Sequence, residues 1–199
     1  MSMKNSRQYD YEKQQQKTAS AAINVAQLVK IIAYDPAKMT VDVQPISKRL
    51  DQGSYESQPP ILSVPVSCQR GGGFAMRVNY KPGDVGSVIF CDHDIDNAVA
   101  GGAEGEPNTE RNHSSSDAVF MGGIATGGGG VSGLPDGFAI GTDDGSIYLA
   151  VTDSGIVILG DVEITGNLTV TGDITATGDV VAGGISLKNH THGGGPTPT

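Results

Sequence analysis

The sequence predicts an all-β protein, in which an N-terminal barrel is followed by a β-helix that three chains form together. Two observations support this fold class. Residues 25–126 alternate short apolar segments with Gly and Pro, which is typical of short antiparallel strands joined by turns. Residues 160–183 repeat a six-residue unit that starts with glycine, and such units bury a core only when neighbours stack on them.

Composition and charge disfavour several classes of protein. Apolar residues make up 37% of the 199 residues and aromatic residues 5%, which is lean for a compact enzyme. The net charge of −9 argues against nucleic-acid binding, because phosphates attract Lys and Arg. An apolar run of about 18 residues and a secretory signal are both lacking, so we expect a soluble protein made in the host cytoplasm. Cys68 and Cys91 are too few for a disulfide framework and are expected to fill core positions.

Residues 1–24 form an N-terminal arm with four basic and two acidic residues. Gln, Lys and Ala are frequent here and favour a short helix, with a cap near Asp10. The arm has no apolar stripe that would pack against a core. We therefore expect a loosely docked segment, and the alternative is a contact with a partner assembly.

Residues 25–126 form the predicted barrel domain. In the segment 38–46 Val41 and Val43 alternate with polar residues, and Asp35-Pro36 before it suits a hairpin turn. A barrel of the oligonucleotide/oligosaccharide-binding (OB) type is one candidate, and a sandwich has the same periodicity. The expected strands lie at 25–34, 38–46, 61–66, 73–78, 85–91 and 118–121.

Residues 92–117 are polar and too long for a tight turn, so they are expected to be a loop between the last two strands. Asp92, His93, Asp94 and Asp96 would suit a metal site, but without a second group of ligands we expect a solvated acidic loop. The segment 113–117 holds His, Ser and Asp, the residue types of a hydrolase triad. Triad members normally come from separate elements, so their adjacency argues against one.

The segments GDVGSVIFCDHDID (83–96) and RNHSSSDAVFMGGI (111–124) resemble the N-terminal domain of central spike proteins from contractile-tailed phage baseplates. The resemblance covers about 100 residues. It implies an OB-type barrel that serves as a trimeric collar on the tail tube or baseplate hub. It also implies that the barrel does not bind nucleic acid, and we expect no small-molecule substrate for the protein.

A Gly-rich linker at 127–135 precedes the predicted shaft, residues 136–187. Glycine recurs every six residues, and apolar residues occupy the third and fifth positions of each unit. Two such side chains per unit do not offset about 1–2 kcal/mol of backbone entropy per residue, so a single chain cannot hold the repeat. We expect a triple-stranded β-helix, and the alternatives are a single-chain solenoid or disorder. The repeating glycines are Gly160, Gly166, Gly172 and Gly178.

Residues 188–199 are the predicted tip. His190 and His192 face the same side of an extended chain, and three chains on one axis would supply six imidazole nitrogens. Six ligands favour iron or another octahedral transition metal over tetrahedral zinc, and the alternative is a pair of exposed tail histidines. The His-x-His also resembles the apex of the same phage spikes, which implies that His190 and His192 bind one iron ion per trimer. We expect the glycines Gly193–Gly195 to let the chain fold back over the tip.

Together these expectations describe a homotrimeric central spike with no enzymatic activity. It would attach to the tail tube or hub, lie at the baseplate tip of the virion and pierce the host outer membrane during tail contraction. One alternative is a β-helical polysaccharide depolymerase, which would need paired carboxylates in an aromatic-lined groove. The other is a receptor-binding tail fibre tip, which usually carries a larger head than the seven residues after His192.

Overall fold

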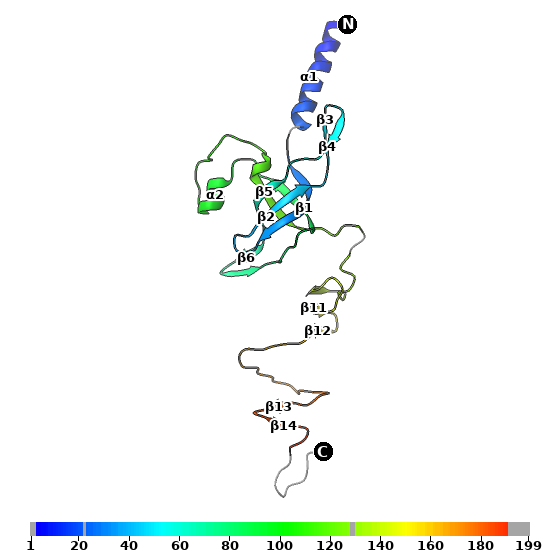
Figure 1. The fold of residues 1–199 in the computed structure, drawn as a ribbon, viewed down its shortest axis with the longest axis vertical. Coiled ribbons are helices and arrows are strands. Elements are labelled where there is room, and N and C mark those ends of the chain that lie inside the picture. Colours follow the sequence, from blue (N-terminus) through cyan, green and yellow to red (C-terminus); the bar gives the residue numbers. More distant parts are fainter. Residues whose placement is uncertain (1–2, 22, 128–129, 191–199) are drawn as a thin grey trace. The chain divides into compact units, whose positions relative to one another are not determined.

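The structure is a computed structural model that describes residues 3–21, 23–127 and 130–190 (Figure 1). It is mostly β with little helix, in agreement with the all-β fold class. The chain divides into two compact units, Met1–Val131 and Ser132–Thr199. The division falls within residues 127–135, and each unit is described by itself.

Helix α1, Met3–Ala21, is longer than the sequence predicts and begins well before Asp10. The predicted cap near Asp10 is therefore wrong, because the helix-favouring composition extends over the whole segment. The side chains of residues 8–17 are all exposed, and i,i+4 hydrogen bonds join Gln8 to Glu12 and Gln15 to Tyr11. Among the described residues, no helix is long and apolar enough to cross a membrane.

Five antiparallel strands form a curled sheet that we call the half-barrel, in the order β5-β2-β1-β8-β9. Its two outermost strands approach each other at one parallel bridge between Val66 and Phe120, and the Ser67 N–H donates to the Phe120 carbonyl at 2.8 Å. This arrangement is consistent with a five-stranded, partly open barrel. The strands are β1 (Ala26–Asp35), β2 (Thr40–Pro45), β5 (Ile61–Pro65), β8 (Val85–Phe90) and β9 (Ala118–Gly123).

The core of the half-barrel follows the alternation seen in the sequence. Val41 and Val43 are buried on β2, while the alternate residues Thr40, Asp42 and Gln44 are half-buried on its other side. The predicted hairpin at Asp35-Pro36 is confirmed, because β1 pairs with β2 and the Asp35 carboxylate accepts the N–H groups of Ala37 and Lys38. The cluster also contains Val29, Ile31, Ile61, Val64, Val88, Phe90, Ala118 and Phe120.

Aromatic rings pack edge to face beside this core. The ring of Tyr80 lies 5.8 Å from that of Tyr34 and 5.1 Å from that of Phe120, both near perpendicular. Gly86 on β8 lies directly against the Phe120 ring, where a Cβ atom would overlap the ring and the Gly122 carbonyl. Glycine at position 86 is therefore required by close packing rather than by a turn.

The strand predicted at 73–78 is not part of the half-barrel. Strand β7 (Phe74–Met76) pairs only with β6 (Gln69–Gly71), in a separate hairpin. Gly72 and Gly73 have φ of 57° and 85°, and this two-residue turn pairs the segment locally. A second short hairpin, β3 (Arg49–Asp51) with β4 (Ser54–Glu56), was not predicted.

The second unit begins with a three-stranded antiparallel meander of β10 (Phe138–Gly141), β11 (Tyr148–Thr152) and β12 (Gly155–Leu159). The first part of the predicted shaft therefore pairs within one chain. Its turns explain why: the Thr142 N–H donates to the Ile147 carbonyl, and Asp144 accepts the N–H and hydroxyl of Ser146. Such local hydrogen bonds close a tight connection between neighbouring strands.

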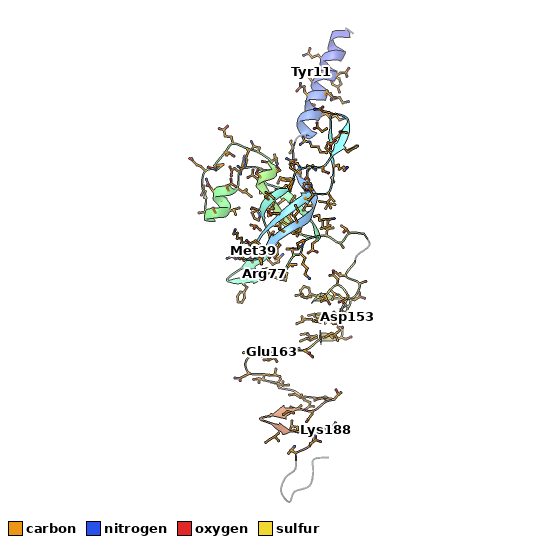
Figure 2. All side chains as sticks on the ribbon, in the orientation of Figure 1. Tyr11, Met39, Arg77, Asp153, Glu163 and Lys188 are labelled. Carbon is orange, nitrogen blue, oxygen red and sulfur yellow. The ribbon has the colours of Figure 1, made fainter. Side chains whose placement is uncertain are left out.

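Only the end of the six-residue repeat, Val181–Ala182, forms a strand within one chain. Residues 160–180, all of which the structure describes, are exposed and outside any ladder; Figure 2 shows their side chains projecting along the trace that includes Glu163. The segment is followed by a hairpin of β13 (Val181–Ala182) and β14 (Ile185–Ser186). Its turn residues, Gly183 and Gly184, both have positive φ.

Candidate functional site

The most unusual surface of the chain is the repeat between Gly160 and Ala182. Its third-position and fifth-position aliphatic side chains are between 42% and 71% exposed, and they recur at a fixed spacing. Single exposed apolar residues are normally scattered over a protein surface without a pattern. A regular array of them in contact with water therefore indicates an association surface. The side chains are Val162, Leu168, Ile174 and Val180 at the third position and Ile164 and Val170 at the fifth.

Of the two predicted metal ligands, the structure describes His190. His190 follows the β13–β14 hairpin, and its Nδ1 is 2.8 Å from the Leu187 carbonyl oxygen. If Nδ1 carries the proton, it donates to this carbonyl and the lone pair resides on Nε2. Metal-bound histidines use this same arrangement, so His190 suits a transition-metal ligand. His192 lies outside the described residues.

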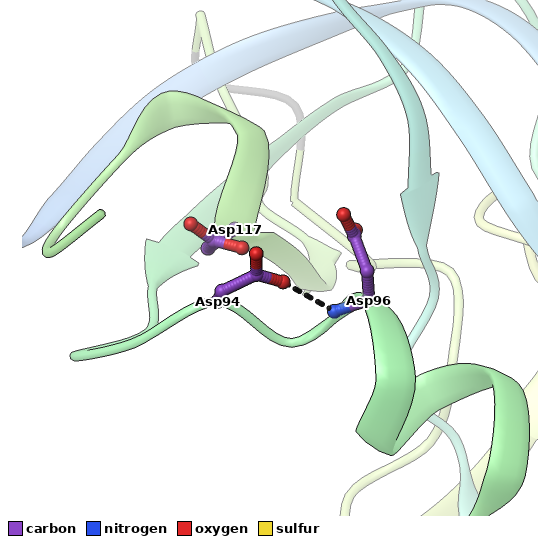
Figure 3. A group of neighbouring side chains, drawn as sticks. All are labelled: Asp94, Asp96 and Asp117. Atoms are coloured by element: carbon purple, nitrogen blue, oxygen red, sulfur yellow. Dashed lines mark hydrogen bonds between the residues drawn. The ribbon is translucent and has the colours of Figure 1, made fainter. Parts of the chain in front are cut away.

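A second polar site lies in the half-barrel loop, between β8 and β9. The carboxylates of Asp94, Asp96 and Asp117 come together with their oxygens within 4.8 Å of one another (Figure 3). Asp94 and Asp117 are buried. Asp94 precedes α2 (Asp96–Gly101), and Asp117 ends the 3-10 turn η1 (Ser115–Asp117).

Arg111 supplies the positive charge of this group. Its Nε lies 2.7 Å from Asp117, and its Nη2 lies 2.9 Å from Asp96 and 3.0 Å from Asp94. The guanidinium thereby lies where a metal cation would bind the three carboxylates. Its ion pairs hold the two ends of the loop close together. We call these four residues, Arg111 with Asp94, Asp96 and Asp117, the Arg111 cluster.

Hydrogen bonds keep the cluster charged. Burial alone would raise the pKa of Asp94, but the Asp96 N–H, the Thr109 hydroxyl and the Arg111 charge together lower it. Hydrogen bonds to Asp117 and Asp96 raise the pKa of Arg111. The prediction of a solvated acidic loop is therefore wrong for Asp94, and sequence reasoning missed Arg111 as its partner.

The His, Ser and Asp residues of the segment 113–117 do not form a relay. The Ser114 hydroxyl oxygen accepts the N–H of Ser116, and Asp117 is held by Arg111. The His113 Nε2 lies 3.7 Å from Asp92 instead. The three side chains thus have separate structural roles, as their adjacency in the sequence predicts.

Neither cysteine occupies the core position predicted for it. Cys68 and Cys91 are both half-buried, and both are free thiols. Desolvation raises the pKa of Cys91, and the negative charges of Asp117 and Asp92 raise it further, so the thiol stays protonated. Cys91 lies at the end of β8, where the strand gives way to the loop.

Comparison with known proteins gives a match to the half-barrel. Residues 29–123 match the family model of the phage protein Gp138 N-terminal domain. No curated protein matches the chain. The matched residues begin within β1 and extend to the end of β9, so they include all of the half-barrel except its first three residues, together with the loop between β8 and β9. Over these residues the chain is similar to a phage protein domain, which supports a structural protein of the phage tail or baseplate and a component of the virion.

Proposed function

We propose that this protein is the central spike of a contractile phage tail, which pierces the host outer membrane when the tail contracts. The observation that carries the proposal is the exposed apolar repeat of residues 160–182. One chain leaves these side chains in water. Three chains wound about one axis would bury them in a shared core and pair their backbones with one another.

The half-barrel is the proposed collar, seated on the tail tube or baseplate hub. Its similarity to a phage protein domain supports this placement, and its strand order suits a compact attachment module. Three collars side by side would hold three shafts in parallel. Attachment of this kind requires no catalytic residues in the half-barrel.

The proposed tip binds one iron ion through His190 and His192 of three chains. The support is the donor set: six imidazoles suit an octahedral transition metal, and the His190 Nδ1 has a carbonyl acceptor within 2.8 Å. The metal would hold together three chain ends that otherwise fray.

Piercing by force requires a stiff, narrow and weakly adhesive rod. The fifth-position side chain decreases in size from Ile164 and Val170 to Ala176 and Ala182, so a three-chain core would narrow toward the tip. Residues 136–199 carry eight acidic residues and one basic residue, a charge that repels anionic lipid headgroups. These properties suit transient passage through a membrane better than stable anchoring.

Asp179 of the repeat has a structural role that differs from the role of a catalytic carboxylate in a glycoside hydrolase. Asp179 accepts the N–H of Lys188 at 3.1 Å, and a hydrogen bond with Ser186 is the main cause of its lowered pKa. The carboxylate therefore braces the β13–β14 hairpin. Asp161 and Asp173 follow glycine in the same way and are exposed.

The test combines native mass, metal content and an activity assay on the purified full chain. We expect a trimer with one iron ion per three chains, and no clearing of cell walls or of capsule in a turbidity assay. Clearing would favour a depolymerase instead. A metal-free trimer would favour a tail fibre tip, and a monomer at micromolar concentration would refute the spike.

A further inference from the structure

One face of the β10–β12 meander consists entirely of large apolar side chains. The register pairs Phe138 with Val151 and Val151 with Ile156, and it pairs Ile140 with Leu149 and Leu149 with Ile158. Directly paired residues lie on the same side of a sheet, as do residues two apart in a strand. We call these six residues the apolar meander face: Phe138, Ile140, Leu149, Val151, Ile156 and Ile158.

This face is bare in a single chain. Its six side chains, two on each of the three paired strands, are between 42% and 72% exposed. On the opposite face Ala150 is completely buried, and Val157 and Leu159 on the outer strand β12 are 41% and 44% exposed. There a Cβ atom on Gly141 would contact the Leu134 side chain, so the chain's own segment before β10 lies against that side.

The size and chemistry of the apolar meander face indicate what covers it. Six side chains of this kind present on the order of 500 Å² of apolar surface, a size that marks an interaction site on a monomer. The face carries no charged or polar side chain, so an identical face meets it without leaving a charge unpaired. Three such faces together reach about 1,500 Å², within the range of stable interfaces.

The meander also leads directly into the repeat, since Gly160 follows the last residue of β12. We propose that the apolar meander faces of three chains pack against one another about a common axis, forming a separate apolar core ahead of the repeat. This inference rests on the proposed trimer and adds a second self-association surface to it. The meander therefore sets the alignment of the three chains before the repeat begins to wind.

The test measures thiol protection in the full chain. In a Cys68→Ser, Cys91→Ser background, Ile156→Cys places a thiol on the apolar meander face. Asp153→Cys is the matched control, since it lies in the exposed turn between β11 and β12. With a water-soluble maleimide, we expect the Ile156→Cys thiol to react about tenfold more slowly than the Asp153→Cys thiol.

Native mass measured on the same samples separates the two proposals. A trimer with a slow Ile156→Cys reaction supports the inference. A trimer in which both thiols react at the same rate overturns it and leaves the spike proposal standing. A monomer overturns both. As a second measurement, Ile158→Asp would place three carboxylates in the proposed core, and we expect loss of the trimer; a trimer of unchanged stability would overturn the inference.

Discussion

Shortening Leu168 to alanine tests whether the repeat is held together by apolar burial between chains. Full burial of a leucine side chain contributes about 1.5–3 kcal/mol. In a single chain 69% of Leu168 is exposed. Burial against the other two chains therefore contributes about 1–2 kcal/mol per chain, and about 3–6 kcal/mol for a trimer. Leu168→Ala removes most of this apolar surface.

The expected result is a dissociation constant for the trimer about 10² to 10⁴ times larger than in the wild type. The trimer then dissociates at a concentration about 10 to 10² times higher, because the midpoint of a monomer–trimer equilibrium varies as the square root of this constant. Sedimentation equilibrium over a dilution series, with added denaturant where the trimer is too stable, measures this change. Thr169→Ala is the matched control, because Thr169 is adjacent and lies at an alternate position of the unit. We expect its effect to be within about 0.5 kcal/mol per chain. Equal effects of the two substitutions would refute a core built from alternate residues.

Three further predictions concern the tip, the half-barrel and the loop. Replacing His190 and His192 by alanine should remove the iron, measured by elemental analysis, while the trimer persists; acid should release the metal from the wild type, because only neutral imidazoles bind it. Gly86→Ala should destabilise the half-barrel by about 1–3 kcal/mol in denaturant unfolding, because its Cβ overlaps the Phe120 ring, whereas Gly71→Ala meets open space and should change stability little. The pKa of Asp94 is lowered from its ordinary value of 3.8, so its carboxylate stabilises the fold above that pH, and the contribution disappears as pH falls through the lower folded value. In the acid range the melting temperature of Asp94→Asn should therefore depend less on pH than that of the wild type, whereas Asp92→Asn should keep the wild-type dependence. Identical pH profiles of the two variants would contradict the role of Asp94.

The half-barrel was largely predictable because its signals are local. Val41 and Val43 alternate with polar residues, and Asp35-Pro36 marks the turn, so pattern and turn chemistry agree. The segment at Phe74–Met76 has an equally good strand pattern. Its pairing partner was decided by Gly72 and Gly73, which turn it back on the preceding residues. Periodicity predicts a strand and does not predict which sheet receives it.

The Arg111 cluster was not predictable from pattern alone. Arg111 lies fifteen residues after Asp96 in a loop rich in polar residues, where burial of a carboxylate has no local signature. The meander is a similar case, because its pairing depends on turn hydrogen bonds at Thr142 and Asp144. The apolar content of both segments of the shaft was visible in the sequence. The three-dimensional structure was needed to show which of the two segments pairs within one chain.

The Arg111 cluster has a consequence for protein engineering. Because one guanidinium holds Asp96 and Asp117, the span between them begins and ends at nearly the same place. The residues of this span from 97 to 110 are all exposed, and closing a longer loop costs little, about 0.6 kcal/mol for each doubling of length. We expect a foreign peptide inserted between Gly102 and Gly105 to leave the half-barrel folded. The loop thus offers a position for displaying peptides on the surface of the domain.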